Sequence, residues 1–502
     1  MITVCLNKAN FEYDIHSLVK AFYAREEVKV FADPEKIQRL EQECSPRLRL
    51  EILYQNGEEG EKDSIEINLL EPREDFGYDI GLTGRTEADF SQRIETKNQL
   101  KRCLYQMLSQ YTGQTLPWGA LTGIRPVKIA MSMLEEGKGD EEIQDYMAQS
   151  YFASPEKINL SIEIAKRERK LLQQVDYQEG YSLYIGIPFC PSICSYCSFS
   201  SSPIEKWKER VQDYLDALEV EINVTAQLCR GRKLNTIYIG GGTPTTLSPK
   251  YLDWLLDKVG EYFDCDHLAE YTVEAGRPDS ITRDKLKVLK DHGISRISIN
   301  PQTMKQQTLD IIGRRHTPEQ AIEVFSIARE LGFDNINMDL IVGLPEESIV
   351  DVRATMEAIQ KLSPDSLTVH SLALKRAARF QMFPEDYQGM EMANSWEIID
   401  LTANYARMMG LAPYYLYRQK NMAGNFENVG YAAPGKAGLY NILMMEEKQP
   451  ILALGAGSIS KRLFSDGRIE RCENVKDVAQ YIGRIDEMIE RKKALFQDFN
   501  LC

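Results

Sequence analysis

The sequence has no excess of basic residues, and this limits what the protein can bind. Lys and Arg total 60 against 75 Asp and Glu, which gives a formal net charge of −15. A protein that binds a nucleic-acid backbone needs clustered cations to neutralise the phosphates. We therefore expect no nucleic-acid partner, although a local basic pocket for a small anion is compatible with this charge.

Long apolar runs are also missing. No stretch approaches the roughly 18 apolar residues that a membrane-spanning helix needs. The first residues, MITVCLNKANFEYD, lack the basic stretch followed by an apolar one that marks a secretory signal. We therefore expect a cytoplasmic protein without a membrane span. The sequence contains no repeat of solenoid-like period and no low-complexity tract.

Paired metal-ligand motifs are scarce. No second CxxC pair and no HxxxH pair accompanies the one group of closely spaced cysteines. A structural zinc ion normally takes its ligands from two such pairs, so zinc is disfavoured. The seven scattered cysteines are expected to be free thiols in a reducing compartment. They are Cys5, Cys44, Cys103, Cys229, Cys265, Cys472 and Cys502.

The length of 502 residues predicts more than one domain. Residues 1–82 alternate the apolar runs MITVCLN, VKVFAD, LRLEILYQNG and SIEINLL with the short helix HSLVKAFYA, which indicates a small α/β domain. Residues 83–177 predict a helical region, because apolar residues recur there at helical spacing. The loop LPWGALTGIRP lies within this region. It is either a packed connection between helices or a loop that closes over an active site.

Residues 178–400 alternate β-branched runs with helical stretches. The runs are SLYIGI, TIYIGG, YTVEA, RISINPQ, INMDLIVGL and SLTVHSLAL. Strands that alternate with helices predict a parallel sheet, and six such units fall short of a complete eight-unit barrel. We therefore predict an α/β fold built on a partial (β/α)6 barrel of the TIM type. Residues 401–502 are expected to form an α+β region that covers the substrate.

The segment IPFCPSICSYC follows the first strand of this predicted barrel and carries Cys190, Cys194 and Cys197. A loop of this length can wrap one corner of a cubane and offer three thiolates to three irons. The fourth iron then has no protein ligand, which leaves it open for chemistry. A zinc site and a set of plain buried cysteines are the competing interpretations. Prolines and serines in a loop at the end of a strand argue against the latter.

A CxxxCxxC motif on a partial barrel resembles the radical S-adenosylmethionine (SAM) superfamily. The resemblance implies a [4Fe–4S] cluster held by the three cysteines, with the amino and carboxylate groups of SAM on the fourth iron. An electron from the cluster would cleave SAM to a 5′-deoxyadenosyl radical, which abstracts an unactivated hydrogen. The electron donor would be a reduced flavodoxin or ferredoxin.

The segments IPFCPSICSYC, GGGTPTTL, GRRHT and NMDLIVGLPEES resemble, within that superfamily, the oxygen-independent coproporphyrinogen III oxidase group. The group comprises the decarboxylating enzyme, related haem chaperones and a longer branch usually called HemZ. WGALTGIRP, EAGRPDSIT and the long N-terminal extension resemble the HemZ branch most closely. The similarity is strongest over residues 181–345.

Several polar residues are candidates for binding one or two SAM molecules. Glycines after the strand TIYIG allow close backbone approach, and exposed N–H groups there can bind a carboxylate. Asp339 stands inside an apolar run, which is costly unless the carboxyl is paired or binds something. An aromatic ring at position 196 could stack on adenine. By resemblance, the SAM-binding residues are Tyr184, Tyr196, Gly240, Gly241, Gly242, Thr243, Glu274, Gln302, Arg314 and Asp339.

Two positions depart from the family. Gly186 stands where a histidine is common, and Phe199 stands where the decarboxylating enzyme has an additional cysteine. A substrate with four carboxylates should be bound by cations. The candidates, which also fit a solvated basic rim, are Lys375, Arg376, Arg418 and Lys420. His316 and His370 are expected to be structural rather than metal ligands.

Three functions follow from the resemblance. The first is oxidative decarboxylation of coproporphyrinogen III propionates to vinyl groups, giving protoporphyrinogen IX in anaerobic haem biosynthesis. The second is other radical chemistry on a tetrapyrrole, such as methyl transfer or ring opening of haem, as the departures at Gly186 and Phe199 suggest. The third is a non-enzymatic haem chaperone, because LGAGSIS resembles a segment of the chaperones.

Overall fold

The computed structural model describes residues 1–24, 26–33, 35–36, 39, 46–58, 61–73, 77–123, 125–392, 394–419 and 426–499. The chain divides into two compact units. The first comprises Met1–Glu163 and Arg418–Phe426, and the second comprises Ile164–Tyr417 and Glu427–Cys502. The division near residue 163 falls inside helix α6 (Pro155–Leu172). The four-part division at residues 82, 177 and 400 remains a prediction.

A five-stranded sheet forms the N-terminal part of the first unit. Its order is β2-β1-β3-β4-β5, in which β1 pairs in parallel with β2 and β3 and the other neighbours are antiparallel. The strands are β1 (Ile2–Leu6), β2 (Val28–Phe31), β3 (Leu48–Gln55), β4 (Asp63–Pro72) and β5 (Tyr78–Ala88). The sequence analysis identified the first four strands but not β5, whose side chains are largely exposed and which contains two glycines, a residue type depleted in strands.

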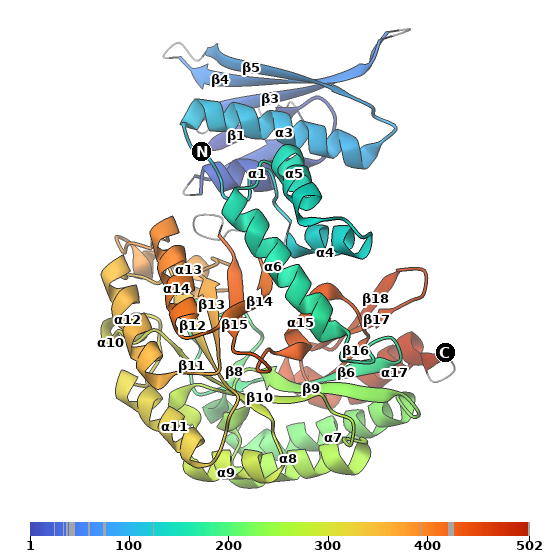
Figure 1. Cartoon of the computed structure of the whole chain (residues 1–502), viewed down its shortest axis with the longest axis vertical. Helices are drawn as coiled ribbons and strands as arrows, with labels where there is room; N and C mark the ends of the chain where they lie inside the picture. Colours follow the sequence, from blue (N-terminus) through green and yellow to red (C-terminus); the bar gives the residue numbers. More distant parts are fainter. Residues whose placement is uncertain are drawn as a thin grey trace. The chain divides into compact units, whose positions relative to one another are not determined.

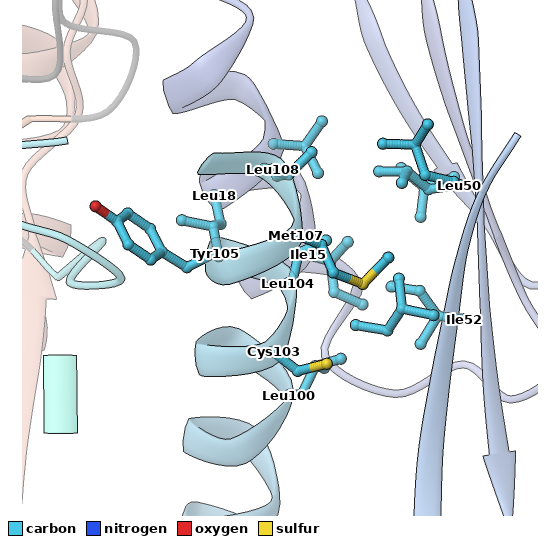
Figure 2. Packing of buried hydrophobic residues seen from close by; sticks show 14 of the residues in the cluster. Ile15, Leu18, Leu50, Ile52, Leu100, Cys103, Leu104, Tyr105, Met107 and Leu108 are labelled. Atoms are coloured by element: carbon cyan, nitrogen blue, oxygen red, sulfur yellow. The ribbon is translucent and has the colours of Figure 1, made fainter. Parts of the chain in front are cut away.

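Helices α1 (Glu12–Phe22) and α3 (Arg93–Thr112) provide the other half of this core. Figure 2 shows apolar side chains of α3, among them Leu104 and Leu108, directed toward Leu50 and Ile52 of β3. β5 also approaches α3 closely, because a Cβ atom at Gly84 would collide with the sulfur of Met107. A larger residue at this position would require the Met107 side chain to move, and the glycine weakens the sequence signal for a strand.

Three further helices are α4 (Val127–Glu135), α5 (Asp140–Tyr151) and α6. The loop LPWGALTGIRP precedes α4. Trp118 in this loop is fully buried, and the amide of Ala120 donates a hydrogen bond to the carbonyl oxygen of Tyr151 at 2.7 Å. These contacts within the first unit favour the interpretation of the loop as a packed helix–helix connection.

The second unit is built on six parallel strands with helices between them. The strands are β6 (Gly180–Ile187), β9 (Lys233–Gly241), β10 (Glu270–Gly276), β11 (Arg296–Gln302), β12 (Ile336–Val342) and β13 (Ser366–Ser371). The helices are α7 (Val211–Leu228), α8 (Pro249–Tyr262), α9 (Arg283–Asp291), α10 (Gln306–Ile311), α11 (Pro318–Glu330) and α12 (Ile349–Leu362). The helices lie along the outer face of the curved sheet (Figure 1). The predicted partial (β/α)6 barrel is confirmed.

C-terminal strands extend this sheet at both edges, giving the order β14-β15-β13-β12-β11-β10-β9-β6-β16-β17-β18. The sheet does not close on itself within the described residues. The added strands are β14 (Ala412–Tyr417), β15 (Asn428–Ala432), β16 (Ile451–Leu454), β17 (Ile459–Leu463) and β18 (Ile469–Glu473). The accompanying helices are α13 (Arg379–Met382), α14 (Trp396–Met408), α15 (Leu439–Glu446), α16 (Val478–Gly483) and α17 (Ile485–Phe496). In the described part of the chain, no helix has the length and apolar character to cross a membrane.

The core of the first unit gives a stability prediction. Leu104 on α3 is fully buried, whereas Ile94 on the same helix is 75% exposed. Truncation of a buried leucine leaves a cavity and typically costs about 2–5 kcal/mol, whereas surface changes stay within about 0.5 kcal/mol. In urea denaturation, Leu104→Ala should therefore lower the free energy of unfolding strongly and Ile94→Ala should not. Equal effects would contradict this core assignment.

Candidate active site

The three cysteines lie on the loop that follows the carboxyl end of β6. Cys190 belongs to the short strand β7 (Phe189–Cys190), which pairs with β8 (Ser202–Pro203). The amide of Cys197 donates to the carbonyl oxygen of Cys194 at 3.1 Å. This turn and the β7–β8 pairing fold the loop back on itself, so that all three thiols come from one compact segment.

The donor set fits an iron–sulfur cluster. Burial raises the pKa of the Cys197 thiol to about 11, and the neighbouring Cys194 and Cys190 push it in the same direction. Thiols gathered in this way favour a bound cation, which deprotonates them. In the described residues, no three His, Cys, Asp or Glu side chains are grouped as ligands of a single metal ion. The thiolates of a cubane bind different irons and need not converge on one point.

Neighbouring segments hold the apex of the cysteine loop. The amide of Ser195 donates to the carbonyl oxygen of Ile312 at 3.0 Å, and its own carbonyl accepts from the amide of Phe380 at 3.1 Å. The hydroxyl of Tyr387 donates to the Ser195 hydroxyl at 2.7 Å. The loop is therefore tied to the segment before Arg314 and to helix α13, which limits movement of Cys194 and Cys197.

The glycine segment after β9 braces the same loop. The amides of Gly242 and Thr243 donate to the carbonyl oxygens of Ile187 and Phe189, each at 2.7 Å. A Cβ atom at Gly242 would lie 2.9 Å from the carbonyl oxygen of Ile187, so only glycine allows this approach. The Thr243 hydroxyl lies 3.6 Å from the sulfur of Cys190. These two amides are thus used within the protein rather than exposed for a carboxylate, which differs from the physical basis given in the sequence analysis.

Glu274 on β10 is a buried carboxyl next to this segment. Its side chain accepts a hydrogen bond from the hydroxyl of Tyr238 on β9. Burial raises the pKa of Glu274 to about 7, and the charge of Asp339 adds to this rise. A buried carboxyl with no cationic partner among the described residues is well suited to receive an ammonium group, such as the amino group of SAM.

The ring of Tyr184 belongs to a group of three stacked tyrosine rings. Its ring stacks at 6.2 Å on Tyr238 and at 6.4 Å on Tyr440 of α15, and those two rings lie 4.6 Å apart. Sequence analysis missed Tyr238 and Tyr440. The spacing of Tyr238 two residues before Gly240 places both on one face of β9, and this was the available signal.

Tyr196 and Arg314, both predicted to bind SAM, contact each other. The hydroxyl of Tyr196 accepts from Nη2 of Arg314 at 3.0 Å and from Nε at 3.2 Å. Gln302 at the end of β11 has a φ of 69°, a backbone conformation that is uncommon for a residue other than glycine. Its buried Oε1 has no hydrogen-bond partner within the described residues. A buried acceptor left open in this way fits a donor of a bound cofactor, such as a ribose hydroxyl.

Asp339 on β12 has the partners that its burial requires. Asn337 donates to its Oδ1 at 2.7 Å, and Nε2 of His370 lies 3.8 Å from its Oδ2. Burial alone would raise the pKa of Asp339, but hydrogen bonds from His370, Asn337 and Thr368 bring it below the usual value. Nδ1 of His370 lies 3.1 Å from the hydroxyl of Tyr417. His370 therefore contacts both Asp339 and Tyr417, and its structural role remains a prediction.

Three of the four candidate substrate cations lie within the described residues. The ammonium of Lys375 lies 5.8 Å from the ring centroid of Phe199, two residues past Cys197, and Arg376 is exposed. Arg418 belongs to the first unit, where it donates to the carbonyl oxygen of Leu121 at 2.6 Å and lies over the Trp118 ring. Lys420 lies outside the described residues. Lys375 is therefore the candidate that contacts the segment following the cysteine loop.

A side chain at position 186 would have close neighbours. A Cβ atom there would lie 3.3 Å from the carbonyl oxygen of Leu454 and 3.4 Å from the Tyr184 ring. The carbonyl oxygen of Gly186 also accepts from the buried hydroxyl of Tyr214 at 2.6 Å. The segment LGAGSIS, which begins at Leu454, thus lies against β6 where a histidine would need space.

Comparisons with known proteins agree with this site. Residues 184–359 match the model of the radical SAM superfamily. The chain is 40% identical over 403 residues to the oxygen-independent coproporphyrinogen-III oxidase-like protein HemZ of Bacillus subtilis (strain 168), covering 79% of this chain and 80% of that protein. It is 30% identical to the heme chaperone HemW of Escherichia coli (strain K12), over 58% of this chain and 72% of that protein.

The fold is similar to the solved structure of coproporphyrinogen III oxidase (HemN) from Escherichia coli, a radical SAM enzyme. The TM-score is 0.50 at 25% sequence identity, and the similarity covers 64% of this chain and 73% of that chain. A radical SAM domain implies a [4Fe–4S] cluster and SAM. Because the relatives include both an oxidase-like protein and a chaperone, these similarities support the family rather than one activity.

Glu274 gives a prediction for the dependence of stability on pH. Its pKa is about 7 in the folded protein against 4.5 for the unperturbed group. The native state therefore favours the protonated carboxyl, and this contribution is present below about pH 4.5 and lost as the pH rises through 7. At about 1.4 kcal/mol per unit, the loss reaches about 3 kcal/mol.

In thermal melts without SAM, Glu274→Gln should therefore melt at a higher temperature than the unchanged protein at pH 8, and the difference should shrink at pH 5. The same substitution at Glu323, which is exposed on α11, serves as the control and should have no such effect. A variant that is less stable than the unchanged protein at pH 8 would contradict the buried, protonatable carboxyl.

Proposed function

This chain belongs to the radical SAM superfamily and, within it, to the oxygen-independent coproporphyrinogen III oxidase-like group, and from that premise we propose that it oxidatively decarboxylates coproporphyrinogen III. The products would be protoporphyrinogen IX and carbon dioxide, formed without oxygen. The observation that supports this function most is the position of Lys375 beside Phe199, immediately past the cysteine loop. A cation at this place is suited to a substrate that carries carboxylates.

The protein would hold its cofactors with the residues described above. Cys190, Cys194 and Cys197 would bind the cluster, and Glu274, Gln302, Arg314 and Asp339, with the aromatic residues Tyr184 and Tyr196, would hold one or two SAM molecules. When bound, the cluster and SAM supply the one-electron chemistry that removes a hydrogen atom from a propionate β-carbon. Loss of carbon dioxide, with transfer of one further electron to an external one-electron acceptor, would then leave a vinyl group, on two rings in turn.

The residues around the loop would bind and orient the substrate. Burial lowers the pKa of Lys375, but the nearby thiol of Cys197 acts in the opposite direction. An ammonium held there can pair with a propionate and fix its β-carbon near the cofactors. Exposed Arg376 would contribute a second cation. A cytoplasmic flavodoxin or ferredoxin would supply electrons to the cluster.

A haem chaperone is the second candidate function. The chain is 30% identical to the heme chaperone HemW of Escherichia coli, and its LGAGSIS segment packs against Gly186 where the family commonly has a histidine. Stoichiometric haem binding without turnover of SAM would favour this candidate. Other radical chemistry on a tetrapyrrole would instead give a product mass that does not correspond to loss of carbon dioxide.

Turnover with a defined substrate tests the proposed function. The reconstituted protein is incubated anaerobically with SAM, a one-electron reductant and coproporphyrinogen III, and mass spectrometry follows 5′-deoxyadenosine and the porphyrinogen. We expect two successive losses of carbon dioxide with two hydrogens. Cys194→Ala should abolish both products, whereas Cys229→Ala, which changes a buried thiol at the end of α7, should keep them. Deoxyadenosine without a change in the porphyrinogen would reject the decarboxylase.

The role of Lys375 gives a separate prediction. A charge-assisted hydrogen bond is worth about 1.5–3 kcal/mol, so its loss should raise KM for coproporphyrinogen III at least about tenfold. Lys375→Ala should show this increase with unchanged iron content. The control is Lys206→Ala, at an exposed lysine beyond the cysteine loop. The same KM in both variants would remove Lys375 from the substrate site.

A further inference from the structure

Arg277 is a buried cation that the function described so far does not use. It follows β10 in the segment EAGRPDSIT and is 3% exposed. Its guanidinium forms a two-pronged ion pair with Asp279, through Nε to Oδ1 at 3.0 Å and Nη2 to Oδ2 at 2.7 Å. This geometry fixes the orientation of the guanidinium plane and leaves Nη1 directed elsewhere.

Nη1 of Arg277 is directed at the cysteine loop. It lies 3.0 Å from the carbonyl oxygen and 2.7 Å from the hydroxyl of Ser192, and 3.7 Å from the sulfur of Cys194. The Ser192 hydroxyl in turn donates to the carbonyl oxygen of Gly313 at 3.0 Å. Arg277 thus contacts the loop between its first and second cysteines and approaches a predicted cluster ligand directly.

A cation in this position acts on a cluster electrostatically. Arginine stays protonated in proteins, so its charge is permanent. The reduction potential of an iron–sulfur cluster depends on nearby charge and on hydrogen bonds to its sulfurs. A positive charge beside Cys194 favours the reduced cluster, which carries one more electron. Asp279 opposes this field, and Arg314 and His316 also lie close enough to influence the Asp279 carboxyl.

We propose that Arg277 is a positioning residue that raises the reduction potential of the cluster by donating to Cys194 and holding Ser192, and that Asp279 is the counter-charge that moderates this effect. The proposal rests on the proposed function in that it requires the cluster. It adds a pair of residues outside the three ligands that adjusts the reduction potential of the cluster to that of its electron donor. Both the cation, Arg277, and the carboxylate that orients it, Asp279, come from the segment EAGRPDSIT.

The two partners are expected to shift the potential in opposite directions. Arg277→Gln removes the cation and should shift the equilibrium about tenfold toward the oxidised cluster, a fall of about 59 mV for a one-electron couple. Asp279→Asn removes the opposing charge and should shift the equilibrium toward the reduced cluster. Both substitutions break the same ion pair, so a purely structural role would move both potentials in the same direction.

The test is an anaerobic redox titration of the cluster-loaded full chain, monitored by electron paramagnetic resonance and accompanied by iron analysis. Arg277→Lys keeps the positive charge but cannot form the two-pronged ion pair with Asp279. Its reduction potential should lie between those of the unchanged protein and Arg277→Gln. Arg315→Gln removes an exposed charge from the neighbouring loop and should leave the potential unchanged. These readouts do not depend on turnover or on the substrate.

The outcomes separate this proposal from the proposed function. An unchanged protein that binds no iron would reject the proposed function itself. A cluster that is present, with potentials that fall in both Arg277→Gln and Asp279→Asn or do not change, would overturn the tuning role. If Arg277→Gln fails to take up iron, Asp279→Asn decides alone, because it retains the guanidinium. Loss of iron from all three ion-pair variants would assign Arg277 to loop structure only.

Discussion

The proposed chemistry of the second unit depends on one constraint: three thiols on a single loop must be held in fixed positions. Cys190, Cys194 and Cys197 satisfy it at the carboxyl end of β6. A cluster with an open iron can bind a substrate or cofactor there, whereas a cluster with four cysteine ligands serves electron transfer. The surrounding contacts can be understood as means of keeping this loop in place.

The loop is braced from three directions. The amides of Gly242 and Thr243 support its first residues, the segment around Ile312 and helix α13 hold Ser195, and Arg277 holds Ser192. The bracing residues come from the segments that follow β9, β10, β11 and β13. Because parallel strands present their carboxyl ends at the same edge, these connections meet there without special long-range folding. The buried Glu274 and the open acceptor of Gln302 lie on strands of the same set.

The cysteine loop and the six parallel strands could be predicted because spacing and β-branched periodicity are local properties, whereas the SAM-binding roles of the candidate residues remain a prediction. β5 was missed because Gly84 serves packing against Met107, which the sequence does not reveal. The glycine amides were expected to face a ligand, but Gly242 and Thr243 use theirs on the backbone of the loop. Arg277 and Tyr238 carry no local signal, since only the tertiary fold brings them to Cys194 and Glu274.

The central claim is that the three-cysteine loop holds a [4Fe–4S] cluster whose fourth iron is open to SAM. Mössbauer spectroscopy of protein loaded with iron-57 tests it most directly, with spectra recorded before and after addition of SAM. The account predicts that one iron site of the cluster changes its isomer shift on SAM binding while the other three stay the same. Four irons that do not respond to SAM, or a cluster that retains its spectrum in Cys194→Ala, would contradict it.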